Sequence, residues 1–179
     1  MDNLSPFTPD IGRALNSLGR EHSIVEYSSI TSDQMASFGS VILSGRRKNN
    51  RLINSTNSRI VKRSAEMNKP ILGICYGAEI IALTLGGTIR RMPSHIQGNS
   101  NVIVSRSNLL TGDKSIVRVY ESHAFCIARL PADFVSLAHS DDCEHEIFSH
   151  KQLPIFGTQF HPEKSGADGL HLLSNFIKL

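Results

Sequence analysis

The sequence predicts an α/β protein with an open, mostly parallel twisted sheet flanked by helices and a small antiparallel extension. The first observation is an alternation of apolar strand-like and amphipathic helical stretches up to about residue 85, typical of parallel strands joined by crossover helices. The second is the apolar stretch 71–74, which does not alternate, as expected of a strand covered on both faces. The third is a change after residue 87 to short strand-like pieces separated by turn residues.

Length and composition indicate an ordinary globular protein. The 179 residues suit one domain with a sizeable core, which we expect to span residues 1–179. A net charge of +3 is too small to indicate nucleic-acid binding. Three widely spaced cysteines without metal-ligand or disulfide spacing predict a reducing, cytoplasmic location. Because no apolar run is long enough to cross a membrane and no signal-peptide pattern is present, we expect no membrane segment.

The first half of the chain supplies most of the parallel sheet. We expect a helix at about 10–18, with Pro9 in its first turn, followed by a strand at 23–27 and a second strand at 38–43. The basic stretch 46–51 is interpreted as a solvated loop, with an anion-binding or docking patch as the alternative. An amphipathic helix at 57–67 then leads to the strand at 71–74.

The second half is expected to extend the sheet with antiparallel strands. Strand-like pieces at 88–91, 102–105, 116–120, 134–138 and 146–149 are separated by turn residues that include Asn99, Gly112 and Asp141. A last apolar strand at 153–160 precedes a polar loop and a terminal helix with Leu170, Leu173 and Ile177 on one face.

Cys75 stands at the break between the strand 71–74 and a helix at about 76–85. Gly73 and Gly77 flank it two residues away on either side, the pattern of a nucleophile elbow in which only glycine leaves room for strand and helix to approach. The N-terminus of the helix is expected to lower the thiol pKa, and the backbone N–H of Tyr76 is free to face an oxyanion. The alternative is a buried core cysteine.

A second chemical element follows the last apolar strand, where His161 and Glu163 stand on either side of Pro162. A thiol nucleophile needs a base for its proton, and the base needs an acceptor that fixes its orientation. A histidine and a carboxylate meet these needs if both strands end at the same edge of one sheet. The alternative is a pair of ordinary polar residues at a strand end.

The motifs Gly73-Ile74-Cys75-Tyr76-Gly77 and Gly157-Thr158-Gln159-Phe160-His161-Pro162-Glu163 together resemble those of the class I (triad-type) glutamine amidotransferases. The resemblance covers essentially the whole chain and implies a flavodoxin-like sheet. It implies that Cys75 attacks the side-chain amide of glutamine, that His161 transfers the proton and that Glu163 orients His161. A thioester would form, and water would release glutamate from it.

The resemblance also implies the residues around the reacting atoms. Tyr76 and Gly45 would hold the oxyanion through backbone N–H groups, and Glu79 would contribute to substrate binding. The segment Ser122-His123-Ala124-Phe125 looks like the family segment whose backbone holds glutamine, which assigns Ser122, Ala124 and Phe125 to substrate binding. His123 is not assigned a catalytic role. The chemistry needs no cofactor, and the sequence shows no metal-ligand spacing.

The chain departs from the family pattern in three places. Glu79 stands where the family usually has glutamine, so it would attract the substrate ammonium but repel its carboxylate. Gly45-Arg46-Arg47 stands where the family usually has Gly-Gly-Pro, and arginine disfavours positive φ. Upstream of Asp2 there is no counterpart of the first strand of the family, so we expect a start site further upstream.

In this family the ammonia usually passes to a synthase domain or subunit, so a partner is implied. The elbow, Leu85-Gly86-Gly87 and Glu121-Ser122-His123 look most like the amidotransferase subunit of GMP synthase, which favours the ATP-pyrophosphatase subunit of that enzyme for the partner. The residues after His161 look like the imidazole glycerol phosphate synthase subunit, and the N-terminus looks like the anthranilate and aminodeoxychorismate synthase subunits.

Two alternatives to an active glutaminase subunit remain open. Glu79 motivates a stand-alone hydrolase that cleaves another γ-glutamyl amide, because an altered amino-acid end could prefer a carboxylate. Glu79 together with Arg46 and Arg47 motivates a catalytically idle regulatory module on the same fold.

Overall fold

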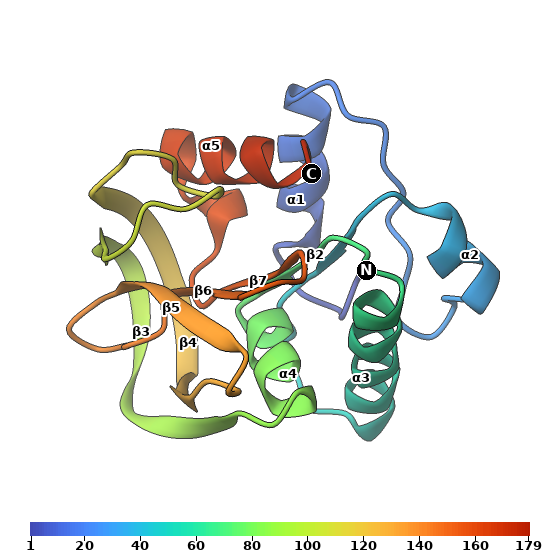
Figure 1. Cartoon of the computed structure of the whole chain (residues 1–179), viewed down its shortest axis with the longest axis horizontal. Coiled ribbons are helices and arrows are strands. Elements are labelled where there is room, and N and C mark those ends of the chain that lie inside the picture. The colour runs from blue at the N-terminus through green and yellow to red at the C-terminus, as the bar shows by residue number, and fades with distance from the viewer.

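The chain folds around one seven-stranded sheet with helices on both faces (Figure 1). The computed structural model describes the backbone of residues 1–179 and the side chains of all residues except Ser32 and Asp33. The strand order is β1-β2-β7-β6-β5-β3-β4. The strands are β1 Val41–Leu43, β2 Ile71–Ile74, β3 Thr88–Val104, β4 Ile116–Arg129, β5 Phe134–His139, β6 Ile147–His150 and β7 Ile155–Thr158. The predicted α/β class is confirmed.

The sheet is mixed rather than mostly parallel. Strands β1, β2 and β7 are parallel to one another, whereas β7, β6, β5, β3 and β4 pair antiparallel. The antiparallel part of the sheet is therefore larger than the small extension that the sequence predicts. The reason is the short connections between β5, β6 and β7, because a short turn can join only antiparallel strands.

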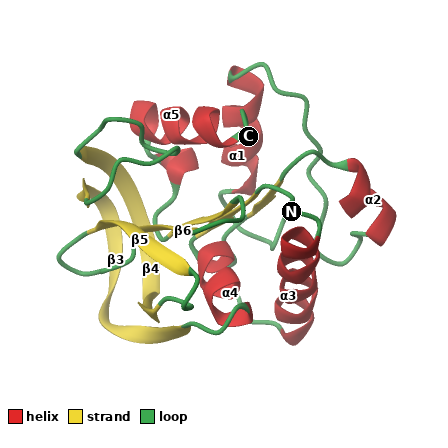
Figure 2. Cartoon of the chain, viewed as in Figure 1, coloured by secondary structure: helices red, strands yellow, loops and turns green.

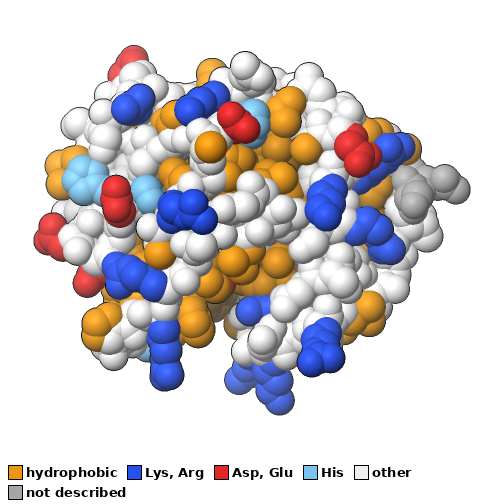
Figure 3. Space-filling model, turned by 60° about the horizontal axis from the view of Figure 1, so that its bottom comes forward, with side chains coloured by type: hydrophobic (Ala, Val, Ile, Leu, Met, Phe, Trp, Pro, Cys, Tyr) orange, Lys and Arg blue, Asp and Glu red, His pale blue; other side chains and the backbone are white. Residues whose placement is uncertain are grey.

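Helices cover both faces of the sheet (Figures 1 and 2). Helices α1 (Thr8–Ser17) and α5 (Gly166–Phe176) pack on one face, and α3 (Arg51–Glu66) and α4 (Tyr76–Thr84) pack on the other. A short helix α2 (Ser32–Ser37) and a 3-10 turn η1 (Pro162–Lys164) complete the set. Within the described residues, no helix is long and apolar enough to cross a membrane. The face drawn in Figure 3 carries separate Lys and Arg side chains among uncharged side chains and several Asp and Glu side chains.

Strand β2 is buried along its whole length because it has a hydrophobic core on each side. Leu72 and Ile74 contribute to the core under α1 and α5, whereas Ile71 contributes to the core under α3 and α4. This arrangement confirms the strand predicted at 71–74 and explains why its apolar residues do not alternate with polar ones.

Two predictions in the first half are corrected. Helix α3 begins at Arg51 rather than at residue 57, because Asn50 caps it by accepting a hydrogen bond from the Leu52 N–H at 2.8 Å. The stretch 23–27 is not a strand: Glu26 forms only an isolated parallel bridge with Asp2. Asn3, which follows Asp2, forms a second parallel bridge with Arg46, so the first residues of the chain lie beside the end of β1.

The long hairpin of β3 and β4 corrects a third prediction. The separate strands expected at 88–91 and 102–105 belong to one strand, and Asn99 pairs with Tyr120 instead of forming a turn. Strand β4 supplies partners over this length, so the ladder continues through polar residues. The register shifts where Arg91 faces Phe125 and Ile96 faces His123. This bulge lies opposite Ala124, next to the site described below.

Candidate active site

The strand-to-helix break at Cys75 has the backbone of a nucleophile elbow. Cys75 has φ 52° and ψ −108°, and it directly precedes α4. A Cβ atom at Gly73 would lie 2.3 Å from the carbonyl oxygen of Gly77, and one at Gly77 would lie 2.3 Å from the carbonyl oxygen of Leu43. Both approaches involve backbone atoms, so a side chain at either position would force the strand and helix apart. The glycines have the packing role that the sequence predicts.

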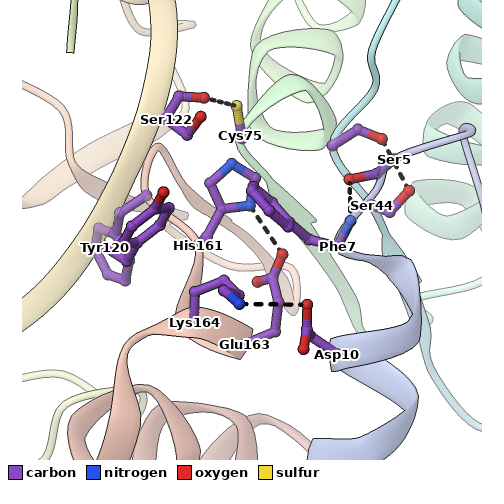
Figure 4. Close-up of polar contacts among 12 residues, drawn as sticks. Ser5, Phe7, Asp10, Ser44, Cys75, Tyr120, Ser122, His161, Glu163 and Lys164 are labelled. Atoms are coloured by element: carbon purple, nitrogen blue, oxygen red, sulfur yellow. Dashed lines mark hydrogen bonds and ion pairs between the residues drawn. The ribbon is translucent and has the colours of Figure 1, made fainter. Parts of the chain in front are cut away.

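The Cys75 thiol is enclosed. The residue is 8% exposed, its N–H donates to the Thr158 carbonyl at 2.7 Å, and its Sγ lies 3.9 Å from the Ser122 carbonyl oxygen (Figure 4). Burial raises the pKa of the thiol well above its ordinary value, and the Glu79 carboxylate raises it further. The Tyr76 N–H acts in the opposite direction, but it is outweighed. The predicted lowering of the pKa is therefore wrong, because burial and nearby carboxylates exceed the effect of the helix terminus.

His161 and Glu163 form a hydrogen-bonded pair at the end of β7. The Nδ1 of His161 lies 2.8 Å from Oε1 of Glu163, and both side chains are buried. Because an ionised carboxylate can only accept, Nδ1 carries the hydrogen and Nε2 is left as the basic nitrogen. Figure 4 shows the His161 ring between Glu163 and Cys75. A base oriented by a carboxylate thus lies beside the enclosed thiol.

Further contacts hold His161 in place. Its N–H donates to the Tyr120 carbonyl at 2.9 Å, and its own carbonyl accepts from the Ser165 hydroxyl at 2.6 Å. The ring of Phe7 packs edge-on against the imidazole, with centroids 4.8 Å apart. Sequence reasoning did not assign roles to Phe7 or Ser165. The position of Ser165 shortly after the His-Pro-Glu motif was the only available signal, and Phe7 is brought to the site by the tertiary fold alone.

The two predicted oxyanion residues lie beside the thiol. The Tyr76 N–H is in the first turn of α4, directly after Cys75, and it acts to lower the pKa of the Cys75 thiol. At Gly45, an added Cβ would lie 3.2 Å from Cε1 of His161 and 3.9 Å from Cβ of Cys75. The loop at Gly45 therefore borders the side chains of both Cys75 and His161.

Arg46, the next residue, belongs to the basic stretch interpreted as solvated. Its guanidinium lies 3.9 Å from the centroid of the Tyr76 ring and donates to Oδ1 of Asn54 at 2.5 Å. The Tyr76 hydroxyl donates to the same oxygen at 2.9 Å. Arg46 is half-buried, whereas Arg47 and Lys48 are exposed, so the solvated interpretation fits those two residues but not Arg46.

The predicted substrate-binding residues come from two elements. Glu79 lies on α4 and is 6% exposed, and Nε2 of Gln159 is 3.5 Å from its Oε1. Burial raises the pKa of Glu79, although Arg46 and Gln159 act against this. Ser122, Ala124 and Phe125 lie on β4 at the bulge, where Phe125 is exposed. Gln159 was quoted in the motif but not assigned to the site.

His123 is bound on both ring nitrogens. Nε2 lies 3.0 Å from Oε2 of Glu121, and Nδ1 lies 2.8 Å from the Phe125 carbonyl oxygen. Burial lowers the pKa of His123, but the hydrogen bond and charge of Glu121 outweigh it and raise the pKa on balance. With both nitrogens bonded, the ring holds the segment around Ala124 through the Phe125 carbonyl and Glu121.

Comparisons with known proteins agree with this geometry. Residues 1–179 match the family model described as "Glutamine amidotransferase class-I". The chain is similar to a subunit of the glutamine-hydrolysing GMP synthase of Pyrococcus furiosus, with 35% identity over 183 residues that cover 100% of this chain and 96% of the relative. The corresponding subunit of Thermococcus kodakarensis is 34% identical over 182 residues, which cover 100% of this chain and 96% of the relative.

Solved structures have the same fold. The crystal structure of a candidate GMP synthase subunit from Thermoplasma acidophilum superposes with a TM-score of 0.89 at 34% identity, covering 99% of this chain and 90% of the other. A glutamine amidotransferase from Thermotoga maritima superposes with a TM-score of 0.73 at 18% identity, covering 94% of this chain and 74% of the other. The second likeness concerns the fold alone.

Proposed function

The chain belongs to the class I glutamine amidotransferases, and from this premise we propose that it is the glutamine-hydrolysing subunit of a GMP synthase. The similarity over the full chain to subunits of glutamine-hydrolysing GMP synthases supports this function. The observation that carries it is the strained, enclosed Cys75 beside a histidine whose Nδ1 is bound to Glu163 at 2.8 Å. That arrangement suits acyl transfer through a thioester.

The reaction begins at the thiol. His161 Nε2 takes the proton of Cys75 while the sulfur attacks the side-chain amide carbon of glutamine, forming a C–S bond. The oxyanion of the tetrahedral intermediate accepts hydrogen bonds from the Tyr76 N–H and from the loop at Gly45. Glu163 stabilises the imidazolium that forms, because its carboxylate is hydrogen-bonded to Nδ1.

The intermediate then collapses. His161 returns the proton to the amide nitrogen, the C–N bond breaks and ammonia leaves. Water attacks the thioester carbonyl and gives a proton to His161, the C–S bond breaks, glutamate is released, and His161 returns the proton to the Cys75 thiolate. The Ser122 carbonyl oxygen lies 3.9 Å from the Cys75 sulfur, and in this mechanism the backbone of Ser122, Ala124 and Phe125 holds the amino-acid end of the substrate. Because burial raises the pKa of the Cys75 thiol, the attack depends on His161 to accept its proton.

The ammonia is delivered to a separate synthase subunit. This part of the proposal rests on the names of the relatives, each of which is one subunit of a glutamine-hydrolysing GMP synthase. We assign the ATP-pyrophosphatase subunit of GMP synthase as the partner. Glutamine labelled with ¹⁵N in its side-chain amide should therefore yield ¹⁵N-labelled GMP when both subunits are present.

Glutamate release from glutamine tests the catalytic assignment. Cys75→Ala should abolish release, and His161→Asn should reduce kcat by about 1,000-fold, since both the proton acceptor and the donor to the leaving group are lost. Cys126→Ala serves as the control, because Cys126 is buried outside the site in a separate small cluster. Release that persists in Cys75→Ala would rule out the mechanism, and faster turnover of another γ-glutamyl amide would indicate a different substrate.

A further inference from the structure

The loop after β1 has an arginine directly after Gly45. The sequence from residue 44 to residue 51 contains no proline, and residues 44–47 are not among the residues with positive φ. The preference of arginine against positive φ therefore does not disturb this loop. Because neither a proline ring nor a left-handed glycine fixes its shape, the contacts of its side chains have to do so.

The residue before Gly45 is anchored by a buried polar network. Ser44, labelled in Figure 4, is 0% exposed, and its hydroxyl donates to the Gly45 carbonyl at 2.9 Å. Asn3 donates from its backbone N–H to the Ser44 hydroxyl at 3.0 Å and from Nδ2 to the Ser44 carbonyl at 2.9 Å. Asn57 on α3 donates in turn to Oδ1 of Asn3 at 2.7 Å. One side of Gly45 is thus fixed to the first residues of the chain and to α3.

The residue after Gly45 is anchored by its own side chain. The Arg46 guanidinium lies over the Tyr76 ring, 3.9 Å from the ring centroid, and donates to Oδ1 of Asn54 at 2.5 Å. The Tyr76 hydroxyl donates to the same oxygen at 2.9 Å. Asn54 lies on α3, and Tyr76 is the first residue of α4. The Arg46 side chain therefore joins the loop at Gly45 to both helices.

The partners of Arg46 are neutral. Among the described residues Arg46 takes part in no ion pair, and its contacts are with amide oxygens and an aromatic ring. A guanidinium suits these partners, because its plane stacks on a ring while its edge donates hydrogen bonds. Tyr76 is only 4% exposed, so its ring is a fixed surface. Arg46 also favours the ionised form of Glu79, so both its charge and its shape can act at the site.

We propose that Arg46 is a positioning residue of the oxyanion hole. Its guanidinium holds the loop at Gly45 against Tyr76, and these two residues carry the backbone N–H groups that the proposed mechanism assigns to the oxyanion. The inference rests on the proposed glutaminase function, because it takes the tetrahedral intermediate to form at Cys75. Arg46 acts through the loop and does not itself touch the reacting atoms.

Fixed donors stabilise an oxyanion more than mobile donors do. Donors that are already in place need no reorganisation when the charge develops, and a misplacement of about 1 Å can cost about 100-fold in rate. The oxyanion is absent from the bound substrate and develops only in the reaction. Loosening of the loop should therefore slow the reaction and leave the binding of glutamine nearly unchanged.

Arg46→Met tests this expectation, because it keeps an unbranched apolar stem and removes the guanidinium. With the full chain and the ATP-pyrophosphatase subunit of GMP synthase present, kcat for glutamate release should fall by about 10- to 100-fold, whereas KM should change by less than about threefold. Arg47→Met is the matched control, because Arg47 is the exposed neighbour, and its kcat should equal that of wild type.

Asn54→Leu separates the position of the guanidinium from its charge, because it removes the hydrogen-bond acceptor and keeps the arginine. It should also lower kcat, by a smaller factor, since the stacking of Arg46 on Tyr76 remains. The double variant with Arg46→Met should lose no more than Arg46→Met alone, because both changes break the same contact.

A reversible aldehyde tests the same contact without turnover. The thiol of Cys75 can add to the aldehyde carbon of 5-oxopentanoate, so that a C–S bond forms and the aldehyde oxygen takes the place of the oxyanion. Protection of Cys75 from iodoacetamide, followed by mass spectrometry, measures this adduct. Arg46→Met should raise the protecting concentration by about 10- to 100-fold. Alkylation without the aldehyde should proceed as in wild type, which shows that the thiol is intact.

The proposal is overturned if Arg46→Met leaves kcat and the protecting concentration unchanged, if it raises KM at unchanged kcat, or if the losses from Arg46→Met and Asn54→Leu multiply. Failure of the proposed function is a different result, because glutamate release would then persist in Cys75→Ala.

Discussion

Cys75 combines a strained backbone conformation with surroundings that disfavour the thiolate form of its side chain. A non-glycine residue at φ 52° is strained, and the sulfur is buried close to the Glu79 carboxylate. Both features are sustained by neighbouring residues: Gly73 and Gly77 allow the close approach of backbone, and the Cys75 N–H is bonded to Thr158. At the residue scale, packing fixes the position of Cys75, and in the proposed mechanism its reactivity depends on His161 and the substrate.

A side chain at Gly77 should destabilise the fold. In Gly77→Ala the new Cβ would lie 2.3 Å from the Leu43 carbonyl oxygen, and backbone atoms cannot move aside cheaply. We expect the free energy of unfolding to fall by about 2–3 kcal/mol, measured by urea denaturation. Gly39→Ala is the control, because nothing lies within 4 Å of a Cβ at Gly39. Equal stability of the two variants would contradict the packing role of Gly77.

The reactivity of Cys75 should depend on pH in a way that Glu79 controls. Because burial and Glu79 raise the thiol pKa, alkylation of Cys75 at neutral pH should be slower than that of free cysteine and should continue to rise above the ordinary thiol pKa. Glu79→Gln removes a neighbouring charge, so its rate-versus-pH curve should move to lower pH. A shift to higher pH, measured by iodoacetamide labelling across about pH 6–10, would contradict this account.

At the element scale, polar stretches were harder to predict than apolar ones. The first turn of α3 contains two apolar residues, Leu52 and Ile53, but only Ile53 is buried, so one apolar contact gave too weak a periodic signal although Asn50 is a suitable cap. The middle of β3 is largely polar and exposed, and its strand conformation depends on pairing with β4. Strand β2, by contrast, is buried on both faces and was predicted with its observed boundaries.

The start of α5 is attached to the β3–β4 hairpin through Asp168. Its carboxylate pairs with Lys114 and accepts the Arg118 N–H at 2.7 Å, and these hydrogen bonds lower the pKa of Asp168. Asp168→Asn should therefore reduce the free energy of unfolding at pH 7 by about 1 kcal/mol.

The pH dependence of this effect has a defined sign. Since the folded pKa is lowered, the stabilisation is present above the ordinary value of 3.8 and is lost as the pH falls through the folded value. The difference between wild type and Asp168→Asn should thus shrink in acid, as urea denaturation at about pH 7 and pH 3 would measure. Glu66→Gln at an exposed site is the comparison, and an undiminished difference in acid would contradict the ion pair.

At the scale of the whole molecule, a buried acidic cluster behind the site should set the pH dependence of stability. Glu121, His123 and Glu146 are all buried, and Oε2 of Glu146 has no partner among the described residues. Burial and the charge of Glu121 raise the pKa of Glu146 to about 8. Glu146 is therefore protonated in the folded protein at neutral pH but ionised in the unfolded chain.

The protein should become less stable as the pH rises from about 5 to 8. In this interval the folded state binds more protons than the unfolded state, and the raised pKa of His123 acts in the same direction. Glu146→Gln should flatten the dependence, so that its stability relative to wild type improves by about 2–4 kcal/mol between pH 5 and pH 8. Thermal or urea unfolding of wild type and Glu146→Gln across this range would measure the effect, with exposed Glu144→Gln as the control. The same slope of stability against pH in wild type and Glu146→Gln would contradict this account.

The sequence by itself determined the Gly-x-Cys-x-Gly and His-Pro-Glu motifs and the α/β class. The Gly-x-Cys-x-Gly pattern predicts the elbow because only glycine tolerates the backbone contacts at Gly73 and Gly77, and apolar periodicity predicts β2, α1 and α5 because their burial is strong. Such signals are local, since each depends on residues within one or two turns of a single element.

Only the tertiary structure decided which residues from distant segments lie together and how burial changes their pKa values. Parallel pairing of β2 with β7 sets Gly73 opposite Gly157, and this register brings Cys75 and His161 to one edge of the sheet. Phe7, Arg46 and Ser165 join the site from other elements, and burial reverses the expected pKa of Cys75. These features depend on contacts between segments far apart in the chain and on exclusion of water, which no local pattern of residues records.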